Sequence, residues 1–124
     1  MSTMNKLANC TNPYQGTAKK VLCLCSAGLL RSPTTAKVLA EEYGYNTRAA
    51  GVNREYALID ISDVLVKWAD EIVVMEKWML NEVIKFDTEN KPLVCLDIED
   101  EYAWNDLALR QEVKTKYDEY LDNQ

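Results

Sequence analysis

Residues 25–32 read Cys-Ser-Ala-Gly-Leu-Leu-Arg-Ser and combine a thiol with a fixed positive charge six positions later. A short apolar run, residues 20–25, leads into this stretch, and a helical pattern over residues 33–43 follows it. The stretch is therefore predicted to be a strand-to-helix loop. Backbone N–H groups and the dipole at a helix start favour a bound anion, and they favour a thiolate over a thiol. The pattern indicates a nucleophile inside an oxyanion cradle.

The residue types in this loop suit phosphoryl transfer through a cysteine. Cys25 would attack phosphorus and form a phosphocysteine. Arg31 offers a planar fork of donors to the phosphate oxygens. Ser32 is expected to cap the helix and to donate to the thiolate. A phosphate or sulfate ion is the expected occupant of the loop, and the residues expected to line it are Ser26, Ala27, Gly28, Leu29 and Leu30.

The chain has no histidine, which excludes Ser-His-Asp and Cys-His nucleophile pairs and the common zinc sites. The loop must therefore activate its own nucleophile, and we expect no metal. The leaving group also needs a proton donor, which must then be a carboxylic acid or its equivalent. An acidic stretch, residues 96–106, follows the last apolar run and offers such groups. Asp100 is the preferred general acid and Asp97 the second choice.

Length and composition indicate a single soluble domain, because the chain has 124 residues, 48% of them hydrophobic and 27% charged. The net charge of −6 and the lack of a basic run disfavour nucleic acid as a partner. No apolar run approaches the roughly 20 residues of a membrane span, so no membrane association is expected.

Residues 1–18 are polar and resemble no secretory signal. We expect them to form a poorly ordered arm before a domain of residues 19–124, in a cytoplasmic protein. The four cysteines agree with that compartment. Cys23 and Cys25 lie two apart on one predicted strand, where a disulfide between them has poor geometry, and Cys95 lies in another apolar run. The pattern is typical of a reduced intracellular protein.

Short apolar runs alternate with helical patterns along the chain, which favours βαβ units and a parallel sheet. The predicted strands are residues 20–25, 47–52, 71–75 and 92–98, and the predicted helices are residues 33–43, 62–69, 76–86 and 105–121. Right-handed crossovers place helices on both faces of the sheet, giving a three-layer α/β fold. The helical stripes are expected to face the core, Val64, Trp78 and Ile84 among them. Ligands in such sheets bind beyond the carboxyl ends of the strands, where the loop after the first strand lies.

Residues 21–34, Val-Leu-Cys-Leu-Cys through Arg-Ser-Pro-Thr, resemble the signature of the low-molecular-weight protein tyrosine phosphatases. Residues 48–52, 69–76 and 98–102 are similar to that family's second strand, third strand and acid loop. The resemblance spans about residues 19–121. It looks closest to a compact subgroup of tyrosine phosphatases that share a Leu-Asp-Ile-x-Asp-x-Tyr segment.

The resemblance implies a four-stranded parallel sheet in the order 2-1-3-4 and hydrolysis of phosphotyrosine without a metal or organic cofactor. It implies the nucleophile role for Cys25, the phosphate clamp for Arg31, thiolate stabilisation for Ser32 and the general acid for Asp100. The implied substrate is a phosphotyrosine-containing protein or a small aryl phosphate. An aromatic residue of the family walls the substrate cleft, and the candidates for that wall are Tyr56, Tyr102 and Trp104.

Three positions depart from the family pattern. Gly28 replaces a usual asparagine, so the turn is kept but the side-chain hydrogen bonds are not. Leu30 stands where a second cysteine is common, and Glu101 replaces the proline of the acid loop. The departures at residues 28 and 101 keep open a catalytically weak or inactive module that binds a phosphate or a phosphoprotein.

Two further functions on the same loop are less favoured. An arsenate reductase of the same fold needs a further pair of cysteines downstream of the loop, and only Cys95 lies there. A phosphatase for RNA ends or small phosphoesters is the other, and the acidic charge disfavours RNA.

Overall fold

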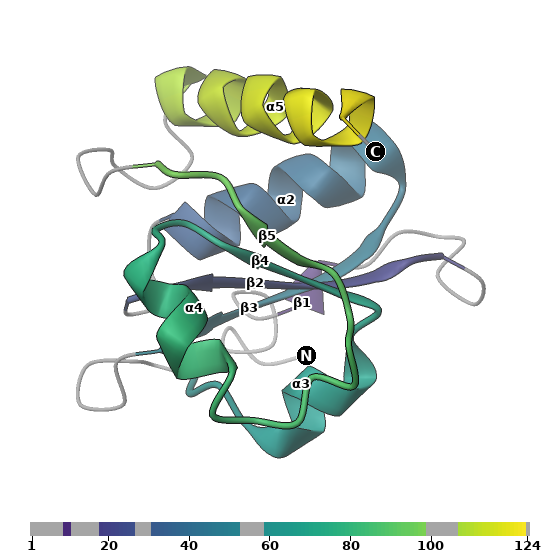
Figure 1. Cartoon of the computed structure of the whole chain (residues 1–124). Helices are drawn as coiled ribbons and strands as arrows, with labels where there is room; N and C mark the ends of the chain where they lie inside the picture. The colour runs from purple at the N-terminus through teal and green to yellow at the C-terminus, as the bar shows by residue number, and fades with distance from the viewer. Residues whose placement is uncertain (1–8, 11–17, 27–30, 53–58, 99–106, 124) are drawn as a thin grey trace.

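The computed structural model describes residues 9–10, 18–26, 31–52, 59–98 and 107–123. They form one sheet in the order β1-β3-β2-β4-β5 (Figure 1). Its strands are β1 (Asn9–Cys10), β2 (Lys20–Cys25), β3 (Asn46–Gly51), β4 (Glu71–Val74) and β5 (Leu93–Cys95). Strands β3, β2, β4 and β5 run parallel, which confirms the predicted four-stranded sheet and its 2-1-3-4 order.

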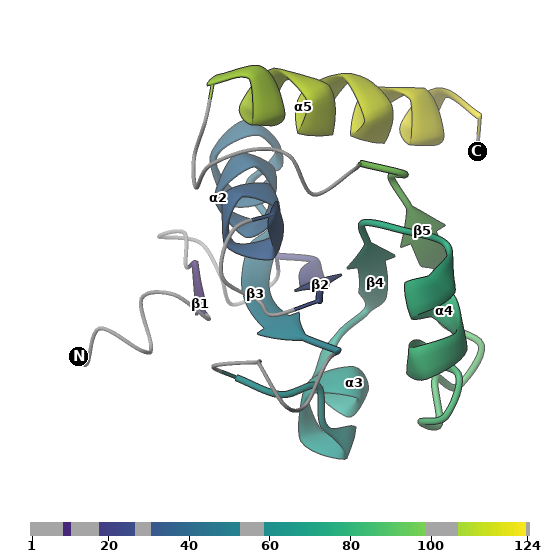
Figure 2. The same cartoon turned by 90° about the vertical axis from the view of Figure 1, so that its left-hand side faces the viewer.

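Helices cover both faces of this sheet, which confirms the three layers. On one face lie α2 (Arg31–Tyr43) and α5 (Leu107–Asp122), and on the other lie α3 (Asp63–Trp68) and α4 (Trp78–Val83), as Figure 2 shows. Ser62 caps α3, since its side chain accepts a hydrogen bond from the Leu65 N–H. None of the helices in the described ranges is long and apolar enough to cross a membrane.

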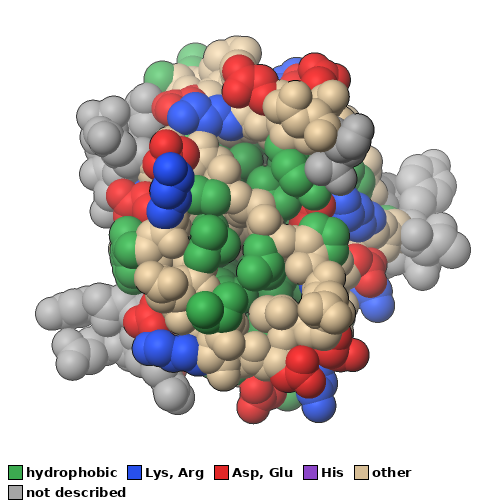
Figure 3. Space-filling view, in the orientation of Figure 1, with side chains coloured by type: hydrophobic (Ala, Val, Ile, Leu, Met, Phe, Trp, Pro, Cys, Tyr) green, Lys and Arg blue, Asp and Glu red, His purple; other side chains and the backbone are tan. Residues whose placement is uncertain are grey.

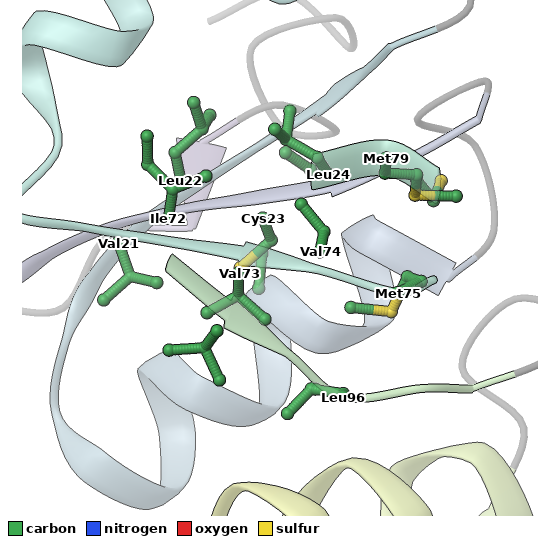
Figure 4. Close-up of a cluster of buried hydrophobic side chains, with 14 of the residues drawn as sticks. Val21, Leu22, Cys23, Leu24, Ile72, Val73, Val74, Met75, Met79 and Leu96 are labelled. Carbon is green, nitrogen blue, oxygen red and sulfur yellow. The ribbon is translucent and has the colours of Figure 1, made fainter. Parts of the chain in front are cut away.

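Strands β2 and β4 lie in the middle of the parallel part of the sheet and carry mostly apolar side chains on both faces, as a parallel sheet between two helical layers requires. Their side chains alternate across the sheet (Figure 4), and those of β4 are all buried. Val21, Cys23 and Val73 point to one side, and Leu22 and Leu24 to the other. Residue 25 has the same parity as residues 21 and 23, so its side chain faces the layer of α2.

The structure differs from several of the predicted boundaries; the predicted helix of residues 76–86, for example, covers only Trp78–Val83. Two residues of the expected N-terminal arm form β1, which pairs antiparallel with Arg48 and Thr47 of β3. Helix α2 begins at Arg31, two residues before the predicted start. Strand β5 ends at Cys95, because the chain turns sharply at Asp97, whose φ is 57°.

Three side chains expected in the core are exposed instead: Val64 at 73%, Trp78 at 47% and Ile84 at 61%. The reason is that α3 and α4 have six residues each, so only a narrow stripe of either reaches the sheet. In α4 that stripe is Met79 and Val83. Apolar side chains also gather on the surface over β5 and α4 (Figure 3).

A buried carboxylate anchors α5 at the edge of the sheet opposite the Cys25 loop. Glu71, the first residue of β4, is fully buried and accepts hydrogen bonds from Lys19 Nζ at 2.9 Å, Tyr117 Oη at 2.7 Å and Tyr120 Oη at 3.2 Å. Burial raises the pKa of Tyr117, and the nearby Tyr45 and Glu71 raise it further, so the hydroxyl stays protonated and keeps donating. The network fixes α5 against the sheet.

Candidate active site

Cys25 is the last residue of β2, the strand at the centre of the sheet. Its backbone oxygen accepts from the Val52 N–H at 2.9 Å, which ties the strand end to the neighbouring segment. Its side chain is 3% exposed, and its Sγ lies 3.2 Å from Ser32 Oγ. The thiol therefore sits at the carboxyl edge of the sheet, against the first turn of α2.

Ser32 is the second residue of α2 and not its N-cap, so the predicted capping role is wrong. The helix begins earlier than expected, and the hydroxyl points at Cys25 Sγ and lies 3.3 Å from the Ala50 carbonyl oxygen. A serine hydroxyl has only one hydrogen to donate. With a thiol, Ser32 can donate to Ala50 and accept from Cys25. With a thiolate, the same hydrogen can turn to the sulfur.

Arg31 is the first residue of α2, and its side chain is only 2% exposed. Its Nη1 donates to the Ile98 carbonyl oxygen at 2.7 Å and lies 3.5 Å from Glu76 Oε2. A buried guanidinium requires such partners, because an uncompensated charge in the interior is costly. Three segments, α2 and those after β4 and β5, thus meet at one guanidinium.

The segment after β5 is held in place by backbone hydrogen bonds. Ile98 N–H donates to the Met75 carbonyl oxygen at 2.7 Å, and Leu96 N–H donates to that of Val74 at 3.0 Å. Lys116 Nζ of α5 donates to the Asp97 backbone oxygen at 2.9 Å. These bonds turn the Ile98 carbonyl toward Arg31 and leave the Asp97 side chain exposed.

The structure brings Cys25, Arg31 and Ser32 together at the carboxyl edge of the sheet, and Ser26 follows β2 there as a half-buried residue. The other predicted site residues lie outside the described ranges, and their roles stay predictions: Ala27, Gly28, Leu29, Leu30, Tyr56, Asp100, Tyr102 and Trp104.

Two residues near Arg31 were not predicted from the sequence to belong to the site. Glu76 follows β4 and faces the guanidinium, and Trp78 Nε1 donates to the same Glu76 Oε2 at 2.8 Å. The rule that sites lie beyond the carboxyl ends of parallel strands applies to β4 as well as β2. Applied to each strand in turn, it points to residues 75–78.

Cys23, Cys25 and Cys95 form no disulfide in the part of the chain that the structure describes. Burial raises the pKa of the Cys95 thiol on β5, although the Asp97 backbone N–H and nearby lysines oppose the shift. Cys95 is therefore a poor thiolate at neutral pH. The thiol that meets a helix start and a buried arginine is Cys25.

Comparison with solved structures relates this arrangement to known proteins. Wzb of Vibrio vulnificus, in complex with benzylphosphonate, matches with a TM-score of 0.66 at 19% identity over 86% of this chain and 99% of Wzb. A low-molecular-weight phosphotyrosine phosphatase of Vibrio cholerae O395 matches with a TM-score of 0.58 at 16% identity over 85% of this chain and 95% of that one. The chain has the low-molecular-weight tyrosine phosphatase fold.

The YwlE arginine phosphatase of Geobacillus stearothermophilus shares this low-molecular-weight phosphatase fold, with a TM-score of 0.65 at 19% identity over 85% of this chain and 92% of that one. No protein-family model and no curated protein sequence matches the chain. The fold expected from the motif of residues 21–34 is thus confirmed by structure.

Proposed function

We propose that this protein is a cysteine-dependent phosphomonoester hydrolase that acts on phosphotyrosine or a small aryl phosphate through a phosphocysteine. One observation carries the proposal. Cys25 Sγ lies 3.2 Å from a buried serine hydroxyl in the first turn of α2, and the buried Arg31 occupies the same turn. A nucleophile, a hydroxyl that can stabilise it and a cationic phosphate clamp therefore share one helix start.

In the first step the Cys25 thiolate attacks phosphorus, forming the P–S bond while the bond from phosphorus to the leaving oxygen breaks. Arg31 and the loop N–H groups hold the oxygens of the transferred group, whose charge they offset. Asp100 protonates the leaving oxygen. A phenolate benefits strongly from this, because its parent acid has a pKa of about 10.

In the second step a water molecule attacks phosphorus and the P–S bond breaks, releasing inorganic phosphate and the Cys25 thiolate. The Asp100 carboxylate takes the proton from the water, so the acid of the first step is the base of the second. Ser32 stabilises the departing thiolate by turning its hydroxyl from the Ala50 carbonyl to the sulfur. The residues alone complete the cycle, and the proposal needs no cofactor.

The substrate assignment is tested by assaying the reduced protein on three matched peptides that carry phosphotyrosine, phosphoserine or phosphoarginine. The last is included because an arginine phosphatase shares the fold. We expect release of phosphate from the phosphotyrosine peptide and from p-nitrophenyl phosphate, and much slower release from the phosphoserine peptide. Preference for phosphoarginine would reassign the substrate. Phosphate binding without turnover of any ester would favour the binding module over the enzyme.

The general acid is tested by comparing Asp100→Asn with Asp97→Asn on a phenyl ester. We expect Asp100→Asn to lower kcat by about 10²-fold or more, because an amide cannot protonate the leaving oxygen. Asp97→Asn is the matched control, since its side chain is exposed while its backbone oxygen is held by Lys116. The reverse order would make Asp97 the acid.

A further inference from the structure

We propose that Trp78 is a specificity-determining residue whose indole forms the wall against which the aromatic group of an aryl phosphate packs. The inference rests on the proposed function and assigns to its site a residue for which the sequence predicted only a core position. Trp78 is the first residue of α4, immediately beyond the carboxyl end of β4. It therefore lies on the same edge of the sheet as Cys25.

The indole is joined to the phosphate clamp through a single oxygen atom. Trp78 Nε1 donates to Glu76 Oε2 at 2.8 Å, and that same oxygen lies 3.5 Å from Arg31 Nη1. Arg31 is buried and held from a second side by the Ile98 carbonyl oxygen, so its guanidinium is a fixed reference point. The hydrogen bond to Glu76 thus holds the Trp78 indole near Arg31, the residue expected to bind phosphate.

The exposure of Trp78 gives the ring a free apolar surface. The side chain is 47% exposed, while its neighbour Met79 is fully buried. An exposed apolar side chain is common by itself and calls for no function. Here the indole N–H donates to Glu76, the carboxylate that also contacts Arg31, and about half of the side chain remains exposed to solvent. Aromatic rings stack on such a surface with a preference beyond simple burial.

Trp78 at this position would distinguish substrates by the length and the aromatic character of the leaving group. A phosphotyrosine ring projects outward from the phosphate and can reach the rim, whereas the short alkyl chain of phosphoserine offers no ring to stack. The loss of the indole should therefore lower the preference for aryl over alkyl esters, and phosphate recognition by Arg31 should contribute equally to both.

The test measures the ratio of kcat/KM for an aryl phosphate to kcat/KM for an alkyl phosphate. A loss of activity that affects both substrates equally leaves this ratio unchanged. We compare the wild type with Trp78→Ala and Trp78→Phe, using p-nitrophenyl phosphate against glycerol phosphate. We expect Trp78→Ala to lower the aryl-to-alkyl ratio of kcat/KM about 3- to 10-fold, mainly through KM, and Trp78→Phe to keep most of the preference because it keeps a ring. Ile84→Ala, which removes an exposed apolar side chain at the other end of α4, should leave the ratio unchanged.

A binding measurement separates this inference from the proposed hydrolysis. In a Cys25→Ser background, calorimetry compares benzylphosphonate with inorganic phosphate, with and without Trp78→Ala. We expect Trp78→Ala to lower the preference for benzylphosphonate about 3- to 10-fold. If the wild-type protein shows no turnover of any substrate, that loss of preference would still support the wall while overturning the hydrolase. An unchanged ratio in an active enzyme, or no binding of benzylphosphonate at all, would overturn the wall.

Discussion

The Cys25→Ser protein is expected to lose turnover of p-nitrophenyl phosphate by at least about 10⁴-fold, because an alcohol at this position is a far weaker nucleophile than a thiolate. Folding and phosphate binding should persist. The substituted hydroxyl still meets Ser32 Oγ, and Arg31 keeps its contact with the Ile98 carbonyl oxygen. Steady-state kinetics measure the loss, and urea unfolding checks the fold.

Cys23→Ser provides the matched control for this substitution. Cys23 lies on the same strand and the same face of the sheet, two residues earlier, and is fully buried, whereas the contact with Ser32 Oγ in the first turn of α2 belongs to Cys25. It should lower the free energy of unfolding by about 1–3 kcal/mol and leave kcat near the wild-type value. Acid quenching of the wild-type reaction should trap a phosphate on the peptide that contains Cys25. Wild-type activity in Cys25→Ser would exclude Cys25 as the nucleophile.

The Arg31→Lys protein is expected to lose about 10²- to 10³-fold in kcat/KM. Lysine keeps the positive charge but loses the planar fork that can hold phosphate while contacting both the Ile98 carbonyl and Glu76. The affinity for inorganic phosphate should fall as well. The loss of the charged donor to the Ile98 carbonyl should also lower the free energy of unfolding by about 1–3 kcal/mol.

Arg110→Lys is the control, because Arg110 of α5 forms an ion pair with Glu41 at 2.9 Å on the surface. Such exposed pairs contribute little, so kinetics and stability should both stay near the wild type. Circular dichroism at the assay temperature confirms that each variant is folded before rates are compared. Arg31→Lys activity within about threefold of the wild type would show that Arg31 is not the phosphate clamp.

Two apolar residues of the predicted helix 76–86 show where sequence periodicity fails. Trp78 and Ile84 match the apolar spacing of a helix and were expected in the core, yet both are exposed. Periodicity reports which positions share a helical face, but α4 is only six residues long and buries just Met79 and Val83. The length and placement of so short a helix depend on the strands that it connects.

The sequence by itself determined the strand, the thiol and the helix that meet at the candidate site. Cys25 and Ser32 are seven residues apart, and a strand followed directly by a helix brings them within hydrogen-bonding distance. Only the tertiary structure decided what holds the arginine. Arg31 and Ile98 are 67 residues apart, and their contact depends on how β4, β5 and α5 position the segment around Asp97. Contacts between residues close in sequence can be predicted from local patterns. A distant residue that binds through its backbone oxygen cannot be recognised in this way, because every residue type has that oxygen.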